Sequence, residues 1–239
     1  LITNEGLISY PSPFVITRWG GTNKKKIALT FDDGPDPRYT PQILEILRRY
    51  QTKATFFVIG MNGSLNPDLL QQIASEGHEI GSHTFTHPNI AVTSQKQLEL
   101  ELNTTERLLE STLKRKSVLF RPPYGEDAEP NTPDQVIPLE LIGNLGYYTI
   151  GMKIDPSDWN NPGIDEIVAA TIKQAENRQG NVVLLHDSGG DRSQTIAALP
   201  KIIQGLRQRG FELVPISELI GLDRKSTRLN SSHTVISYA

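Results

Sequence analysis

The repeated alternation of short apolar segments with amphipathic segments constrains the fold of this chain more than any other feature. Apolar, strand-like segments occupy 26–31, 54–59, 79–82, 118–121, 147–150, 181–185 and 211–214. Segments with helical periodicity occupy 41–50, 67–76, 95–114, 132–145, 164–177, 193–209 and 216–220, although Pro138 is expected to interrupt its helix. Continuous apolar strands are typical of a parallel sheet, and seven such units without a glycine-rich dinucleotide turn predict an α/β barrel.

The domain is predicted to span 24–222, which is long enough for one such barrel. Residues 1–23 mix proline and glycine with apolar side chains and are interpreted as a lead-in or linker without a regular element. Residues 223–239 lack apolar periodicity and resemble a translated sequencing adapter, so we expect a disordered, artefactual tail. The chain begins without an initiator methionine, and we expect it to be part of a longer protein.

Charge and cysteine content exclude several classes of function. The net charge is −3, which argues against a nucleic-acid partner because there is no general excess of basic residues to contact phosphates. The chain has no cysteine, so any metal must be bound by histidine and carboxylate side chains. No apolar run is long enough to span a bilayer.

Polar residues follow the predicted strands at the points where these end, which is where barrel enzymes place their active sites. These residues are Asp32, Asp33, His83, Arg121, Asp155, Asp158 and His186. We therefore expect one functional site at this end of the barrel.

The most informative of these groups are two adjacent carboxylates and a histidine pair. Asp32 and Asp33 would repel each other, so we expect a nearby cation or a role in proton transfer, with helix capping as the alternative. His83 and His87 are four residues apart, and on one helical turn both would face a single divalent metal. One aspartate with both histidines makes a three-ligand set with an open position, typical of a catalytic site. Histidines that are satisfied within the core or that cap a helix remain the alternative.

Three further residues suggest substrate binding and proton transfer. Arg121 offers a permanent cation for a carboxylate, although a simple surface ion pair is equally compatible with its position. Trp159 follows Asp158 and could line a pocket or stack on a sugar. His186 ends a buried strand and is a candidate general acid, whose orientation and pKa a nearby aspartate would set.

Five blocks in this order, TFDDGP, SHTFTH, RPPYG, DPSDW and LLH, resemble the motifs of the polysaccharide deacetylases of carbohydrate esterase family four, also called the NodB-homology domain. The resemblance runs from about Lys25 to Leu222. It implies a distorted (β/α)7 TIM-like barrel and metal-dependent removal of N-acetyl groups from an N-acetylglucosamine-containing polysaccharide, such as chitin oligomers or peptidoglycan. An O-acetyl esterase acting on xylan and a catalytically silent carbohydrate-binding domain are the two alternatives.

The resemblance also implies a role for each matching residue. A divalent metal, Zn²⁺ with Co²⁺, Ni²⁺ or Mn²⁺ as substitutes, would be bound by Asp33, His83 and His87. Asp32 would be the general base toward the attacking water, paired with Arg121. His186 would protonate the leaving amine and would be tuned by Asp158.

Substrate contacts and protein context follow from the same resemblance. Leu184 and Trp159 would line the pocket for the acetyl methyl group, and the backbone N–H of Tyr124 would help to hold the oxyanion. The stretches 13–21, 125–130 and 186–194 resemble deacetylase domains that are joined, within larger bacterial proteins, to a glycoside-hydrolase-like domain and a membrane glycosyltransferase, and the resemblance implies the same context for this chain. The expected location is therefore extracytoplasmic or associated with the cell envelope.

Overall fold

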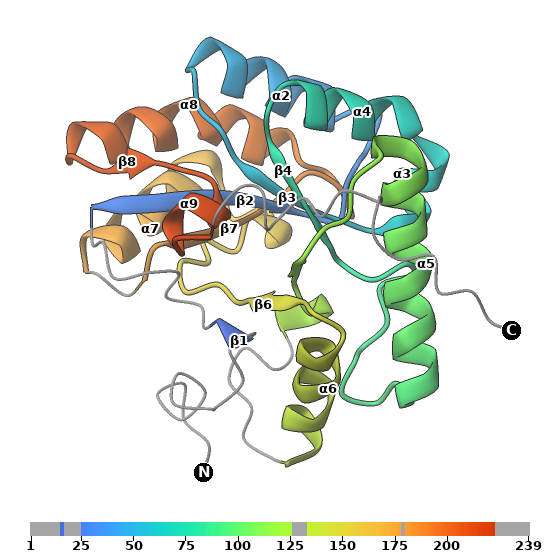
Figure 1. Cartoon of the computed structure of the whole chain (residues 1–239). Helices are drawn as coiled ribbons and strands as arrows, with labels where there is room; N and C mark the ends of the chain where they lie inside the picture. The colour runs from blue at the N-terminus through green and yellow to red at the C-terminus, as the bar shows by residue number, and fades with distance from the viewer. Residues whose placement is uncertain (1–14, 17–24, 126–132, 178–179, 223–239) are drawn as a thin grey trace, which may run out of the picture.

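A curled parallel sheet forms the centre of the computed structural model, which describes residues 15–16, 25–125, 133–177 and 180–222 (Figure 1). Within these ranges the sheet has eight strands, in the spatial order β1-β6-β5-β4-β3-β2-β7, with β8 paired to the beginning of β2. The strands are β1 (Val15–Ile16), β2 (Lys26–Asp32), β3 (Thr55–Val58), β4 (Glu79–Ser82), β5 (Leu119–Phe120), β6 (Tyr148–Ile150), β7 (Val182–His186) and β8 (Glu212–Leu213). The seven strands predicted from the sequence are thus present.

Distant strands of the sheet are joined just beyond β6. Ile154 forms a parallel bridge to Val183 of β7, and its carbonyl accepts a hydrogen bond of 2.9 Å from the backbone N–H of Leu184. This contact links the segment after β6 to β7 across the gap in the strand order. The sheet therefore curls into a distorted barrel, which confirms the predicted α/β fold class.

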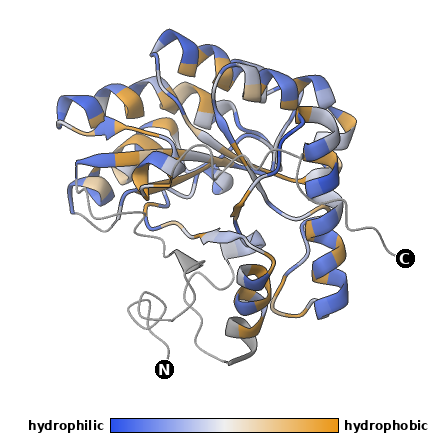
Figure 2. Cartoon of the chain, in the orientation of Figure 1, coloured by the Kyte–Doolittle hydropathy of each residue, from blue (hydrophilic) through white to orange (hydrophobic). Residues whose placement is uncertain are grey.

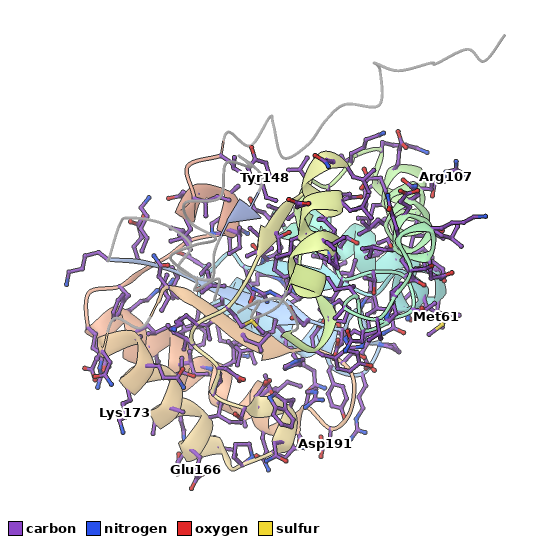
Figure 3. All side chains as sticks on the ribbon, turned by 90° about the horizontal axis from the view of Figure 1, so that it is seen from below. Met61, Arg107, Tyr148, Glu166, Lys173 and Asp191 are labelled. Atoms are coloured by element: carbon purple, nitrogen blue, oxygen red, sulfur yellow. The ribbon has the colours of Figure 1, made fainter. Side chains whose placement is uncertain are left out.

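Helices cover the outer face of the sheet. They are α2 (Thr40–Arg49), α3 (Gly60–Leu65), α4 (Pro67–Ser75), α5 (Gln95–Leu113), α6 (Pro133–Asn144), α7 (Ile164–Glu176) and α8 (Ser193–Gln208), with 3₁₀ turns η1 (Pro123–Gly125) and η2 (Asp158–Asn160). The short helix α9 (Ile216–Leu219) instead packs on the interior side, in one cluster with Ala28 of β2 and Phe57 of β3. Helices α4, α2, α8 and α7 follow one another around the barrel (Figure 1). Hydrophobic residues lie on the strands and the inner faces of the helices (Figure 2), while Glu166 and Lys173 of α7 point outward (Figure 3).

The continuous apolar sequence of β2 is explained by burial on both of its faces. Ile27, Leu29 and Phe31 pack with the inner faces of α2 and α8 in the largest hydrophobic cluster. Ala28 belongs to a different cluster on the other face of the strand. Because side chains alternate along a strand, Asp32 shares the interior side with Ala28 and lies at the end of the barrel where β2 stops.

The structure corrects the prediction for residues 1–23 and the prediction for Pro138. Residues 15–16 form a strand that is parallel to β6, so the lead-in does contain a regular element. Helix α6 runs through Pro138 without interruption. Its buried Leu139 and Ile142 pack with Phe120, and this packing compensates for the hydrogen bond that proline cannot donate.

Helix α3 was not predicted, because its sequence GMNGSL has low helix propensity. The helix forms where the backbone N–H groups of Gly60 and Met61 donate to the carbonyls of Thr84 and Phe85, each at 2.9 Å. The predicted tail 223–239 lies outside the described residues, so the domain bounds 24–222 stay a prediction. None of the helices in the described ranges is both long enough and apolar enough to traverse a bilayer.

Candidate metal centre and active site

The carboxyl ends of β2, β4 and β7 bring the predicted site residues together. Asp32 ends β2, His83 directly follows β4, and His186 ends β7. Parallel pairing aligns these ends, with Asp32 opposite His186 and Val58 opposite Ser82. The carboxylates and histidines that are far apart in the chain therefore share one end of the barrel.

Asp33, His83 and His87 form the one group in the described residues whose side chains could hold a metal ion. Their ligand atoms all lie within 4.8 Å of one another. Oδ1 of Asp33 lies 3.5 Å from Nε2 of His83 and 3.4 Å from Nε2 of His87. The geometry selects Asp33 rather than Asp32 as the carboxylate nearest to both imidazoles.

The segment from His83 to His87 is a loop, so both histidines face one site, as their spacing suggested, but no helical turn brings them together. Thr84 and His87 adopt left-handed backbone conformations with φ of 66° and 64°. The side chain of Thr84 accepts a hydrogen bond of 3.0 Å from the backbone N–H of His87. The loop folds back on itself and turns both imidazoles toward Asp33, with ring centroids 4.9 Å apart.

The environment of His83 leaves its Nε2 atom available as a ligand. Its Nδ1 lies 2.8 Å from the carbonyl oxygen of Arg121, which can only accept, so Nδ1 carries the proton. Burial lowers the pKa of His83 to about 3, although the charge of Asp33 opposes that shift. A neutral imidazole oriented through Nδ1 is the usual form of a metal-ligating histidine.

A divalent cation fits this cluster. Oδ1 of Asp33 is buried and has no hydrogen-bond partner in the part of the chain that the structure describes. A buried carboxylate oxygen without a donor is costly, and a cation held jointly with the two Nε2 atoms would satisfy it. Two imidazoles and one carboxylate leave a coordination position open, as in catalytic metal sites.

Asp32 is bound to Arg121, which is fully buried and is not the surface ion pair that the sequence left open. Nη1 of Arg121 donates to Oδ1 of Asp32 at 2.8 Å and to Oγ1 of Thr30 at 2.6 Å. The guanidinium also lies over the ring of Phe57, 4.2 Å from its centroid. Burial raises the pKa of Asp32 above its ordinary value, against the opposing charge of Arg121. The carboxylate is therefore fixed in position and made more basic.

His186 and Asp158 form a second pair. Nδ1 of His186 lies 2.8 Å from Oδ1 of Asp158, whose Oδ2 accepts hydrogen bonds from the His186 backbone at 2.9 Å and from Thr195 at 2.7 Å. Burial alone would lower the pKa of His186, but the hydrogen bond and charge of Asp158 raise it above the ordinary value. The aspartate that contacts His186 is thus Asp158, from the loop after β6. Asp187, the next residue in the chain, binds Gly34 and Thr40 instead.

The three predicted substrate contacts have different environments. Leu184 is buried in β7, Trp159 is 53% exposed in η2, and Tyr124 is 67% exposed in η1. The ring of Tyr124 packs edge-on against His87, with centroids 4.5 Å apart, and its φ is 63°. The two aromatic side chains are therefore accessible from solvent, and Tyr124 adjoins the metal cluster directly.

Two carboxylates near the site were missed from the sequence. Asp187 accepts hydrogen bonds from the backbone N–H of Gly34 at 3.0 Å and from Thr40 at 2.6 Å, and burial raises its pKa to about 7. A Cβ atom at position 34 would collide with Oδ2 of Asp187, so a larger residue there would displace this carboxylate. Glu101 binds the loop between His83 and His87. A charged residue within the apolar stripe of a predicted helix was the available signal for Glu101.

Comparisons with known proteins agree with this geometry. A family model described as polysaccharide deacetylase matches residues 20–148. A peptidoglycan-N-acetylglucosamine deacetylase from Bacillus cereus is 45% identical over 202 residues, which cover 83% of this chain and 89% of the relative. A chitooligosaccharide deacetylase from Sinorhizobium fredii is 36% identical over 202 residues, which cover 80% of this chain and 90% of the relative.

A solved structure resembles the whole barrel. The Bc1960 peptidoglycan N-acetylglucosamine deacetylase, in complex with an N-hydroxybenzamide compound, superposes with a TM-score of 0.77 and 32% sequence identity. The match covers 84% of this chain and 91% of that chain. The similarity therefore extends beyond the segment that the family model matches.

Proposed function

This chain belongs to the polysaccharide deacetylase family, and from that membership we propose that it hydrolyses N-acetyl groups of N-acetylglucosamine units in a glycan. The products are acetate and a free amine on the sugar. The observation that carries the proposal is the arrangement of Asp32 and His186 beside the cluster of Asp33, His83 and His87. An amide is a poor electrophile and an amine a poor leaving group, so the reaction needs activation at both atoms.

Asp33, His83 and His87 would hold the divalent metal, which we propose to be Zn²⁺ with Co²⁺, Ni²⁺ or Mn²⁺ as substitutes. When bound, the metal would polarise the acetamide carbonyl and make the attacking water more acidic. The contact of Nδ1 of His83 with the Arg121 carbonyl supports this assignment, because it leaves Nε2 free to coordinate.

Asp32 is proposed to be the general base that removes a proton from the attacking water. Its Oδ1 is occupied by Arg121, whereas Oδ2 lies 3.9 Å from Nε2 of His83 and so adjoins the proposed metal ligands. The pKa of Asp32 lies above its ordinary value, which makes it a better proton acceptor than an exposed aspartate.

His186 is proposed to be the general acid that protonates the leaving nitrogen. Asp158 fixes the Nδ1 side of the ring, so the Nε2–H is the group available to the substrate. The hydrogen bond and charge of Asp158 raise the pKa of His186 and so favour its protonated form, which this role requires. Leu184 and Trp159 are proposed to line the acetyl pocket, and the backbone N–H of Tyr124 to hold the oxyanion.

We propose a glycan of the cell envelope as the substrate. The relative from Bacillus cereus is named for peptidoglycan, and the relative from Sinorhizobium fredii for chitooligosaccharides. Both polymers present N-acetylglucosamine, and peptidoglycan lies outside the cytoplasm. Fusion of this domain to glycoside-hydrolase-like and membrane glycosyltransferase domains is part of the same proposal, and the parent reading frame would test it.

The test is mass spectrometry of glycans after incubation with the metal-loaded protein. Chitin oligomers and peptidoglycan fragments should lose acetyl groups, and acetylated xylan should remain unchanged. An Asp32→Asn variant loaded with the same metal serves as the control for contaminating activity. Release of acetate from xylan alone would identify an O-acetyl esterase, and binding of glycans without any loss of acetyl groups would identify a silent binding domain.

A further inference from the structure

We propose that Glu101 is a positioning residue that fixes the loop between His83 and His87 and thereby sets the affinity of the site for a divalent metal. This inference rests on the proposed metal site. Glu101 belongs to α5, the helix that follows this loop in the chain, and the residue is only 4% exposed. Buried glutamates usually have specific partners, and the partners of Glu101 are in this loop.

The carboxyl group of Glu101 contacts the centre of the loop with both of its oxygens. Oε2 accepts hydrogen bonds from the backbone N–H groups of Phe85 at 2.8 Å and Thr86 at 2.7 Å. Oε1 accepts from Oγ1 of Thr86 at 2.8 Å and from the side chain of Gln97 at 3.0 Å. One side chain therefore satisfies two consecutive backbone donors midway between the two histidines.

The opposite side of the loop is bound by helix α3. The backbone N–H groups of Gly60 and Met61 donate to the carbonyls of Thr84 and Phe85 at 2.9 Å each. The side chain of Met61 itself is 46% exposed and projects outward (Figure 3), so Met61 holds the loop through its backbone. The loop is thus fixed between α3, which binds its carbonyls, and Glu101, which binds its N–H groups.

The conformation of the loop explains why it needs such restraint. Thr84 and His87 have φ of 66° and 64°, a region that non-glycine residues rarely occupy and that is least favourable for a β-branched side chain. Strained residues persist when their surroundings define the backbone around them. Without Glu101, the N–H groups of Phe85 and Thr86 would lose their acceptor and the loop would relax. The Nε2 atoms of the two histidines would then no longer converge on Asp33.

The decisive experiment compares metal affinity and folding stability in the same variants. Glu101→Ala removes all four acceptor contacts, whereas Glu101→Gln keeps an amide oxygen that can accept from both backbone N–H groups. Glu99→Ala is the matched control, because Glu99 lies on the same helix and binds only the exposed Gln95 side chain among the described residues. Zn²⁺ and Co²⁺ affinities are measured by isothermal titration calorimetry, the Co²⁺ absorption spectrum reports ligand geometry, and thermal unfolding of the metal-free proteins reports stability.

We expect Glu101→Ala to lose about tenfold or more in metal affinity and to change the Co²⁺ spectrum, a loss typical of residues that orient metal ligands. Glu101→Gln should retain most of the affinity, and Glu99→Ala should match the wild type. If Glu101→Ala only lowers the unfolding temperature and binds metal as the wild type does, Glu101 is merely structural and the inference is wrong.

A second variant keeps the test decisive if Glu101→Ala does not fold. Thr86→Ala, at an exposed position, removes the hydroxyl that donates to Oε1 together with the γ-methyl group, keeps the backbone N–H that donates to Oε2, and should give a smaller but measurable loss of affinity. Unchanged affinity in folded Thr86→Ala would then overturn the inference. If the wild-type protein binds no divalent metal, both the proposed function and this inference are wrong. If only the variants depart from the expected affinities, the inference alone is wrong.

Discussion

Asp32 and His186 are register partners in the parallel pairing of β2 with β7. The backbone carbonyl of Asp32 accepts a hydrogen bond of 3.1 Å from the N–H of Asp187, the residue directly after His186. The proposed base and the proposed acid are therefore held at one level of the barrel by neighbouring strands. The negative charge of Asp32 also contributes to raising the pKa of His186, so each group affects the protonation of the other.

The two adjacent aspartates should separate catalysis from metal binding. Asparagine preserves the shape of either side chain but removes its charge. We expect Asp32→Asn to bind metal normally while turnover falls by about 100-fold or more, the usual contribution of a general base. Asp33→Asn should lose both metal and activity. Metal stoichiometry and initial rates of acetate release measure the two effects, and the opposite pattern would show that the base and the ligand are interchanged.

Each histidine of the cluster should be necessary for metal binding and dispensable for folding. His83→Ala and His87→Ala are expected to weaken metal binding by more than about tenfold, since each removes one of three ligands. Unfolding of the metal-free variants should stay cooperative. The control is His78→Asn, because Nδ1 of His78 accepts from the N–H of Ala54 and an asparagine oxygen can replace it. Wild-type metal content in both alanine variants would refute the ligand assignment.

Asp158 should set the alkaline limit of the pH–rate profile. The general acid must be protonated, so activity falls as the pH rises through the pKa of His186, which Asp158 raises by hydrogen bond and charge. Asp158→Asn removes that charge and should shift the alkaline limb to lower pH. Rates of acetate release measured across the pH range provide the test, and an unmoved alkaline limb would mean that another group limits the rate.

Glu106, away from the metal cluster, should make stability depend on pH. Its Oε2 accepts from the hydroxyl of Tyr147 at 3.3 Å, and burial raises the pKa of Glu106 to about 7. A carboxyl whose pKa is higher in the folded than in the unfolded state favours folding at low pH, and this advantage is lost as the pH rises from about 4.5 to 7. Glu106→Gln should therefore stabilise the protein at pH 8 by about 1–3 kcal/mol and not at pH 4. Urea unfolding at the two pH values would show a pH-independent difference if this is wrong.

The sequence alone determined the elements that depend on local periodicity. The apolar run of β2 and the amphipathic pattern of α5 indicate which side chains are buried. Buried positions recur with the repeat of a strand or a helix, so the sequence pattern predicts the type of element. The strand-end positions of Asp32, His83 and His186 followed from the same pattern, because parallel strands in a barrel end at one rim. Local pattern could not predict α3, whose glycines and asparagine disfavour a helix.

The tertiary structure alone decided how the site is assembled. The spacing of His83 and His87 suggested a helical turn, but the structure brings them together in a loop with two left-handed residues. That conformation is stable because Glu101 and the beginning of α3 supply hydrogen bonds from distant parts of the chain. Asp33, the carboxylate that faces both imidazoles, likewise has a left-handed backbone conformation with φ of 77°, which the sequence pattern did not predict. These hydrogen bonds join segments that share no periodic sequence pattern and meet only in the folded barrel. A local pattern therefore cannot predict them.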